Sequence, residues 1–184
     1  MSILVVAATR AEASYVPDGL PVALTGVGKT AAATAVAKAL AEMRGITEVV
    51  NIGTAGALRD GLEGILQPGR VLNHDLSADA IKVLGYDPME DLPVGSGDPE
   101  LVLASGDVFV TDPKVRALIA KRAQLVDMEG YAVVWACRAF RMPVRLVKHV
   151  SDNADEGAMD WPDLVDRSAR LLGEWLTEWL DGHR

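Results

Sequence analysis

The sequence predicts an α/β fold: one domain, 1–184, whose central, mostly parallel mixed sheet is flanked by helices. Three observations lead to this prediction: short continuous apolar runs, helical segments that alternate with them, and a composition suited to one core. Of the 184 residues, 49% are hydrophobic and 24% are charged. A chain of this length buries roughly 70% of its unfolded surface on folding, so it needs no disulfide or structural metal.

The first apolar run, Ser2–Ala8, is continuous and rich in β-branched residues. This pattern is typical of a strand buried on both faces in a parallel sheet. A short strand is also expected at Gln124–Val126. Four further runs bounded by Gly, Pro or polar residues predict similar strands at Leu20–Leu24, Glu48–Ile52, Leu101–Ala104 and Val144–Val150.

Helical segments separate these runs. Lys29–Arg44 is rich in Ala and other strong helix formers, and Gly45 provides a C-terminal stop. Glu129–Phe140 predicts a second helix that ends before Pro143. A last helix begins at about Pro162, where Leu, Val and Trp recur at spacings of three and four and form one apolar stripe.

Strands that alternate with helices place the ligand crevice of such a domain at the carboxyl ends of the strands. Functional residues are therefore expected just after the apolar runs. The stretch Gly85–Asp98 is acidic and rich in Pro and Gly, which predicts an exposed loop.

Charge and cysteine content exclude several classes of protein. The 18 Lys and Arg against 26 Asp and Glu give a net charge of -8, which disfavours nucleic acid as a partner. No stretch approaches the ~18 apolar residues of a membrane span, and no basic segment precedes Ile3–Ala8 as in a signal peptide. The lone Cys137 indicates a reducing compartment. We therefore expect a soluble, cytoplasmic protein without a membrane partner.

The segment Thr25–Thr30 ends in Gly-Lys-Thr, as phosphate-binding loops do. Such a loop needs Gly five residues before its Gly-Lys pair, and Ala23 stands there, so an NTPase is not expected. Two interpretations stay open for this turn: amides that face an anion or a sugar hydroxyl, and simple turn geometry.

No nucleophile or metal site is evident in the sequence. Ser105 and Ser151 are not in a nucleophile elbow, and His74, His149 and His183 lack the spacing of a triad or a metal set. Histidines within strands are more often structural than catalytic. We expect neither a metal nor an organic cofactor.

Three carboxylates follow predicted strands: Glu12, Glu129 and Asp152. Acidic groups at the carboxyl ends of parallel strands converge on one crevice, where they could protonate a leaving group, activate water and hold hydroxyls. The alternative for Glu129 is a favourable charge at a helix N-terminus, and for Asp152 a helix or turn cap.

Six segments in one order resemble the nucleoside phosphorylase and nucleosidase superfamily, most closely its methylthioadenosine/S-adenosylhomocysteine nucleosidase branch. Together they extend over nearly the whole chain. The segments are Ile3–Glu12 (ILVVAATRAE), Leu24–Ala32 (LTGVGKTAA), Val49–Leu58 (VVNIGTAGAL), Ser105–Val110 (SGDVFV), Val126–Ala132 (VDMEGYA) and Val150–Asp155 (VSDNAD).

The resemblance implies a purine nucleosidase that hydrolyses the N-glycosidic bond of an adenine nucleoside. Glu12 would activate the attacking water, and Asp152 would donate a proton or hydrogen bond to the purine N7. Glu129 would accept the ribose hydroxyls, Met128 would pack on the sugar, and Phe109 would stack on the purine. The remaining implied substrate contacts are Ala8, Thr54, Ala55, Gly56, Val110 and Ser151.

The resemblance also bears on the acceptor. Asn51 stands where related phosphorylases carry an Arg, which favours water over phosphate, although Arg10 and Lys29 could supply cations instead. Two alternatives therefore stay open: a phosphate-dependent purine nucleoside phosphorylase and a non-catalytic nucleoside-binding relative. Departures from the family pattern leave the exact substrate open. They are a short segment between Tyr15 and Leu20, Lys148 in place of a common Arg, and Gly130-Tyr131 after the Met-Glu pair, where smaller residues are usual.

Similar nucleosidases cover the 5′-substituent with a loop from a partner subunit. The segment Gly85–Pro93 resembles that loop, with Met89 and Leu92 as lid residues. A homodimer is therefore expected.

Overall fold

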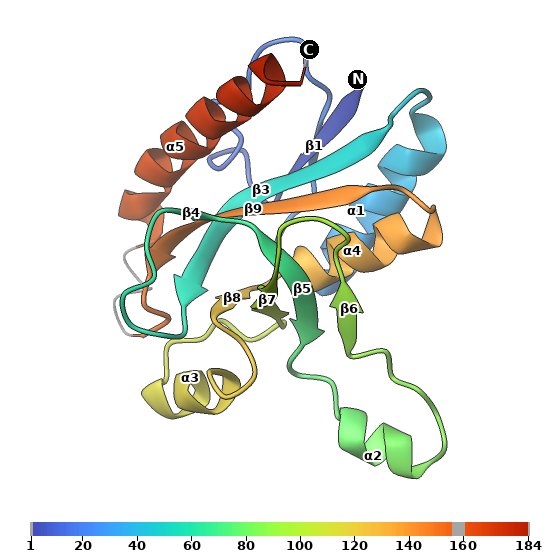
Figure 1. The fold of residues 1–184 in the computed structure, drawn as a ribbon, viewed down its shortest axis with the longest axis vertical. Coiled ribbons are helices and arrows are strands. Elements are labelled where there is room, and N and C mark those ends of the chain that lie inside the picture. The colour runs from blue at the N-terminus through green and yellow to red at the C-terminus, as the bar shows by residue number, and fades with distance from the viewer. Residues whose placement is uncertain (1, 156–160, 184) are drawn as a thin grey trace.

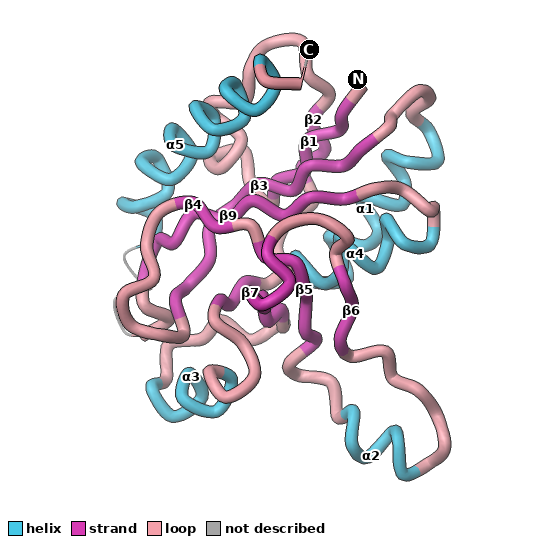
Figure 2. Tube along the Cα trace, in the orientation of Figure 1, coloured by secondary structure: helices cyan, strands magenta, loops and turns pink. Residues whose placement is uncertain are grey.

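The computed structural model describes residues 2–155 and 161–183. Its strands are β1 (Ile3–Ala7), β2 (Val22–Leu24), β3 (Glu48–Ala57), β4 (Ile65–Leu66), β5 (Pro68–Asn73), β6 (Asp91–Pro93), β7 (Asp98–Ser105), β8 (Leu125–Asp127) and β9 (Val144–Asp152). Its helices are α1 (Lys29–Glu42), α2 (Ala78–Val83), α3 (Pro113–Ile119), α4 (Gly130–Ala139) and α5 (Trp161–Asp181). Figure 2 distinguishes the helices, strands and loops.

One mixed sheet organises the molecule (Figure 1). Its main path is β2-β1-β3-β8-β7-β5-β6, and β9 pairs with β3 and with β4. The pairings of β1 with β2 and β3, of β3 with β9, and of β7 with β5 and β8 are parallel. The other three pairings are antiparallel. The predicted α/β class with a mostly parallel mixed sheet is confirmed.

Helices cover both faces of the β1-β3-β9 region (Figure 1). Val50 and Ile52 of β3 pack with Leu172 and Leu176 of α5 on one face. Val49 of β3 belongs to the cluster on the other face, with residues of α1 and α4. Successive residues of β3 therefore serve opposite faces, and burial of both apolar faces is the main stabilising contribution to this part of the fold.

The sequence located nine of the described elements but did not predict β4, β5, β6, α2 or α3. Among the predicted strands, β3 and β2 differ from expectation. β3 extends five residues beyond the predicted Ile52, because its Gly, Thr and Ala residues stay paired with β9 as far as Gly56. The Leu20–Leu24 run gives an edge strand, β2, in which Val22 and Leu24 are each 40% exposed. Burial of this run on both faces was therefore a wrong prediction, since one side of β2 has no neighbour.

The predicted exposed loop Gly85–Asp98 contains β6, which pairs with β5. Leu92 is only 2% exposed and belongs to the core, so its prediction as a lid residue is wrong. Met89 also packs against that core, and its carbonyl oxygen accepts a hydrogen bond from the Tyr131 hydroxyl at 2.6 Å. The acidic and turn residues of this segment surround two buried apolar positions, Leu92 and Val94, which the loop prediction did not anticipate.

Helix α2 projects from the body of the molecule (Figure 1). Val83 at its end is 86% exposed, and Leu84 and Tyr86 just beyond it are 72% and 71% exposed. Within residues 2–155 and 161–183, no helix has both the length and the apolar character needed to cross a bilayer.

Candidate active site

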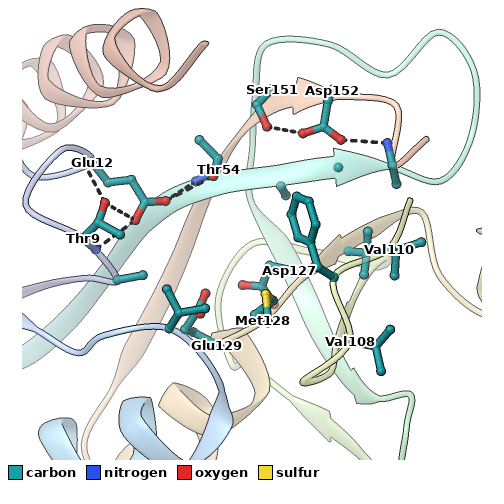
Figure 3. A pocket seen from close by; sticks show the side chains of 17 residues that line it. Thr9, Glu12, Thr54, Val108, Val110, Asp127, Met128, Glu129, Ser151 and Asp152 are labelled. Carbon is teal, nitrogen blue, oxygen red and sulfur yellow. Dashed lines mark hydrogen bonds between the residues drawn. The ribbon is translucent and has the colours of Figure 1, made fainter. Parts of the chain in front are cut away.

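A cavity of about 510 Å³ lies where β1, β3, β8 and β9 end and where the chain leaves β7, a volume within the usual range for small-molecule sites. Figure 3 shows the lining side chains, with Glu12 and Asp152 at opposite sides of the view and Glu129 and Met128 below them. The seventeen lining residues are Ala8, Thr9, Glu12, Val27, Thr54, Ala55, Gly56, Val108, Phe109, Val110, Val126, Asp127, Met128, Glu129, Ser151, Asp152 and Ala154.

Every catalytic or substrate-contacting residue that the resemblance implied lies in this lining, whereas the implied lid residues Met89 and Leu92 do not. The structure brings together Ala8, Glu12, Thr54, Ala55, Gly56, Phe109, Val110, Met128, Glu129, Ser151 and Asp152. Their individual roles stay predictions. Sequence reasoning did not include the other lining residues, namely Thr9, Val27, Val108, Val126, Asp127 and Ala154.

Glu12 is fixed by two threonines and is only 4% exposed. One carboxylate oxygen, Oε2, accepts hydrogen bonds from the Thr9 amide at 3.1 Å and the Thr9 hydroxyl at 3.2 Å. The other, Oε1, accepts from the Thr54 amide at 3.0 Å and the Thr54 hydroxyl at 3.2 Å (Figure 3). Four donors hold the Glu12 side chain in one orientation at the cavity wall.

Glu129 lies at the start of α4 and contacts the start of α1. Its Oε1 accepts a hydrogen bond from the Gly28 amide at 2.8 Å, and the Lys29 amide donates to Asp107 at 2.7 Å. Two carboxylates of the chain itself therefore occupy the amides of the Thr25–Thr30 turn. These contacts lie within the chain, so whether the turn also faces a ligand stays a prediction.

The pKa of Glu129 is raised to about 7, first by burial and then by the nearby negative charge of Asp127. The Gly28 hydrogen bond and the Lys148 charge act in the opposite direction without offsetting these causes. Glu129 therefore changes its protonation state near neutral pH.

A buried ion pair supports the floor of the site. Lys148 Nζ lies 2.9 Å from Asp127 Oδ2, and both side chains are 2% exposed. Asp127 also accepts hydrogen bonds from the Ser105 hydroxyl at 2.5 Å and the Gly130 amide at 2.9 Å. Burial alone would lower the pKa of Lys148. The negative charges of Asp127 and Glu129 raise this pKa by more than burial lowers it, so the net shift is upward. The ammonium therefore stays charged and paired.

Asp152 is the last residue of β9, and its side chain bonds to neighbouring residues of the same segment. Its carboxylate accepts hydrogen bonds from the Ser151 hydroxyl at 2.6 Å and the Ala154 amide at 2.8 Å (Figure 3). Ala154 has a positive φ of 51°, which is uncommon for a residue with a side chain. Gly56 makes room for this turn, because a Cβ there would lie 2.9 Å from Ala154 Cβ and 3.0 Å from Asp152 Oδ1.

The charges at the cavity are acidic. Its lining, within the described part of the chain, has four carboxylates and no Lys, Arg or His. The two cations considered for phosphate are outside it: Lys29 binds Asn73 and Asp75, and Arg10 is exposed. His149 is bound through Nδ1 to the Ser168 hydroxyl at 2.9 Å, in keeping with a structural role.

The fold and site together define an α/β protein with an acidic small-molecule cavity at the carboxyl ends of its strands. The family model of the phosphorylase superfamily matches residues 18–94 and 99–178. The chain belongs to this superfamily.

Curated relatives and solved structures extend the comparison. The chain is 27% identical over 160 residues to an aminodeoxyfutalosine nucleosidase of Helicobacter pylori, an alignment that covers 74% of this chain and 70% of that protein. It is 28% identical over 183 residues to a 5′-methylthioadenosine/S-adenosylhomocysteine nucleosidase of Shewanella denitrificans, covering 84% and 79%. A crystal structure of the Helicobacter pylori 5′-methylthioadenosine/S-adenosylhomocysteine nucleosidase superposes with a TM-score of 0.84 at 23% identity, covering 98% of this chain and 97% of that one. This structural likeness concerns the fold.

Proposed function

We propose that this chain is a purine nucleosidase that cleaves the N-glycosidic bond of an adenine nucleoside with water. One observation carries the proposal: Glu12, Glu129 and Asp152, far apart in the sequence, line one nucleoside-sized cavity. The names of the curated relatives, aminodeoxyfutalosine nucleosidase and 5′-methylthioadenosine/S-adenosylhomocysteine nucleosidase, support this class of substrate.

The proposed chemistry uses two acids on opposite sides of the bond. Cleavage of a ribosyl C–N bond leaves an oxocarbenium-like sugar and a poor anionic leaving group. Glu12 takes a proton from water as that water attacks the anomeric carbon. Asp152 donates a proton to the purine N7, so that the base leaves neutral. In this role the hydroxyl of Ser151, 2.6 Å from the carboxylate, orients the Asp152 side chain.

The remaining lining residues suit the other parts of a nucleoside. Glu129 in its carboxylate form accepts the ribose 2′- and 3′-hydroxyls, and Met128 packs against the sugar. Phe109, half exposed at the cavity, stacks on the purine, while the backbone of Val110 contacts the edge of the base. The small residues Ala55 and Gly56 allow the nucleoside to approach the backbone of β3.

Water is favoured over phosphate as the acceptor because of the charge of the site. A phosphate dianion would enter a cavity whose described lining holds four carboxylates and no basic side chain. The buried ammonium of Lys148 is already paired with Asp127 at 2.9 Å. Phosphate sites in proteins ordinarily supply Arg, Lys or clustered amides, so the geometry supports hydrolysis.

Purified protein incubated with methylthioadenosine in phosphate-free buffer tests this function. We expect release of free adenine and methylthioribose at a rate that added phosphate does not change. Chromatography of the products measures this rate. Phosphate-dependent formation of a ribose 1-phosphate derivative would assign a phosphorylase instead. Binding of nucleosides without turnover of methylthioadenosine, S-adenosylhomocysteine or aminodeoxyfutalosine would assign a binding protein.

Substrate binding is expected to weaken below neutral pH. Because the pKa of Glu129 is about 7, the hydroxyl-accepting carboxylate is present above that pH and is lost by protonation below it. KM for methylthioadenosine should therefore rise by about tenfold per pH unit below the pKa and level off above it. Steady-state kinetics between pH about 5.5 and about 8.5 measure this profile. The Glu129→Gln variant should have a high KM without this dependence; a wild-type KM that stays flat would contradict the role of Glu129.

We also propose that a second copy of the chain completes the site. The projecting segment at the end of α2 has three exposed apolar side chains, Val83, Leu84 and Tyr86. Two apolar side chains that line the cavity, Val27 and Val108, are 59% and 53% exposed. Apolar surfaces of this kind are typical of protein interfaces. Sedimentation equilibrium should give the mass of a homodimer, and a monomer at micromolar concentration would contradict the proposal.

A further inference from the structure

The sheet divides at the position of Asp152. Gly56 of β3 and Asp152 of β9 form the last register pair between these strands, and a register shift precedes it at Ala55. Beyond this pair β3 continues beside β8, with Ala57 opposite Leu125, whereas β9 ends. Asp152 therefore lies at a fork in the sheet, and strand pairing no longer fixes the chain that follows it.

One arginine bridges this fork. Arg116 of α3 donates a hydrogen bond from Nε to the carbonyl oxygen of Asn153 at 2.7 Å. The same Nε also donates to the carbonyl oxygen of Ala57 at 3.2 Å. These two carbonyls belong to the residues that directly follow Asp152 and Gly56. The Nε hydrogen is shared between the two diverging chains as a three-centre hydrogen bond.

The surroundings of Arg116 make this bridge effective. The side chain is 21% exposed, and hydrogen bonds from a partly buried guanidinium to carbonyls are charge-assisted. Arg116 also lies 3.0 Å from Asp60, whose side chain is 97% exposed, so this ion pair contributes little. The turn that Arg116 holds includes Ala154 at its positive φ, a conformation that persists only where the surrounding structure enforces it.

We propose that Arg116 is a positioning residue for Asp152. It is not one of the residues that line the cavity, and it acts by fixing the Asn153 carbonyl, which sets where the Asp152 carboxylate stands relative to a bound purine. This inference rests on the proposed function, in which Asp152 bonds to N7. Displacement of a reacting group by about 1 Å is enough to cost about a hundredfold in rate.

Binding of adenine and 7-deazaadenine tests this role, because the second compound has a carbon in place of N7. Calorimetry on the full-length chain should show that wild-type protein binds adenine about tenfold or more tightly than 7-deazaadenine. In Arg116→Met this preference should fall to about twofold or less, while the affinity for 7-deazaadenine stays at the wild-type value. Hydrolysis of methylthioadenosine should show a kcat about 10- to 100-fold lower with KM nearly unchanged.

Two further variants complete the experiment. Arg116→Lys keeps a cationic hydrogen-bond donor at this position and should restore part of the adenine preference. Arg122→Met removes an exposed arginine just beyond α3 that pairs with Glu90 at 3.1 Å, and it should behave as wild type. Thermal unfolding of each variant verifies that it is folded.

The outcomes separate this inference from the function on which it rests. A wild-type protein with no preference for adenine over 7-deazaadenine would overturn both the role of Arg116 and the proposed contact of Asp152 with N7. Wild-type preference retained in Arg116→Met would overturn the role of Arg116 alone. Equal loss of both ligands in Arg116→Met would also overturn it, since that result indicates support of the whole cavity rather than of Asp152.

Discussion

Asp152→Asn is expected to lower kcat for methylthioadenosine by about 10²- to 10⁴-fold, the usual contribution of a positioned general acid. An amide has the same shape as the carboxyl group but cannot deliver a proton to N7. The Ser151 hydroxyl and the Ala154 amide, at 2.6 and 2.8 Å, place the side chain, so the loss should arise in the chemical step rather than in folding.

Single-turnover kinetics with excess enzyme measure this effect on bond cleavage separately from product release. Asp60→Asn is a matched control, because Asp60 lies near the same end of the sheet but its side chain is 97% exposed. It should retain wild-type kcat. Cleavage by Asp152→Asn at more than about a tenth of the wild-type rate would contradict the assignment of the general acid.

The elements that sequence alone located well are those whose local pattern agrees with their tertiary surroundings. The run Ser2–Ala8 is apolar from Ile3 onward, and β1 is buried on both faces. The predicted helix Glu129–Phe140 matches α4 closely, with these two residues as its caps. Local propensity and burial point to the same structure in these segments, so a single sequence is sufficient.

Other elements depend on contacts between distant residues. β6 is three residues long within an acidic, Pro-rich segment, and only its pairing with β5 makes it a strand. The ion pair at the cavity, which the sequence did not predict, also depends on such contacts. Asp127 and Lys148 come from β8 and β9 and become an ion pair only in the folded sheet. Strand alternation within β8 cannot indicate which cation of another strand lies beside Asp127.

The candidate site was located through a resemblance of six segments rather than through spacing. Individually, Glu129 reads as a helix-end charge and Asp152 as a turn cap, and the structure shows both features: Glu129 precedes α4, and Asp152 bonds to the Ala154 amide. Structural and functional interpretations of these residues are therefore compatible. Glu129 and Asp152 also line the same cavity. This shared position, which capping alone does not require, indicates a functional site.

Different environments favour different roles for the acids. Glu12 accepts four hydrogen bonds from Thr9 and Thr54, whereas burial and Asp127 raise the pKa of Glu129 to about 7. A fixed carboxylate suits the activation of water at a defined point. A carboxyl group that titrates near neutrality suits reversible binding of sugar hydroxyls.

Glu12→Gln is expected to lower kcat by about 10²- to 10⁴-fold, because the amide cannot take a proton from the attacking water. The geometry predicts a second effect. Both Glu12 oxygens accept hydrogen bonds from backbone amides, of Thr9 and Thr54, so the NH₂ group of Gln must face one of these donors. One buried amide is then left without an acceptor, which costs about 1–3 kcal/mol of unfolding free energy.

Denaturant unfolding, single-turnover kinetics and adenine binding together distinguish these effects. Glu12→Gln should be less stable and nearly inactive yet should bind adenine as tightly as wild type, since its proposed role places Glu12 at the water and sugar rather than at the base. The control Glu42→Gln changes an exposed residue at the end of α1 and should leave all three measurements unchanged. Weak adenine binding by Glu12→Gln would move Glu12 to the purine end of the cavity, and a wild-type rate would remove it from the reaction.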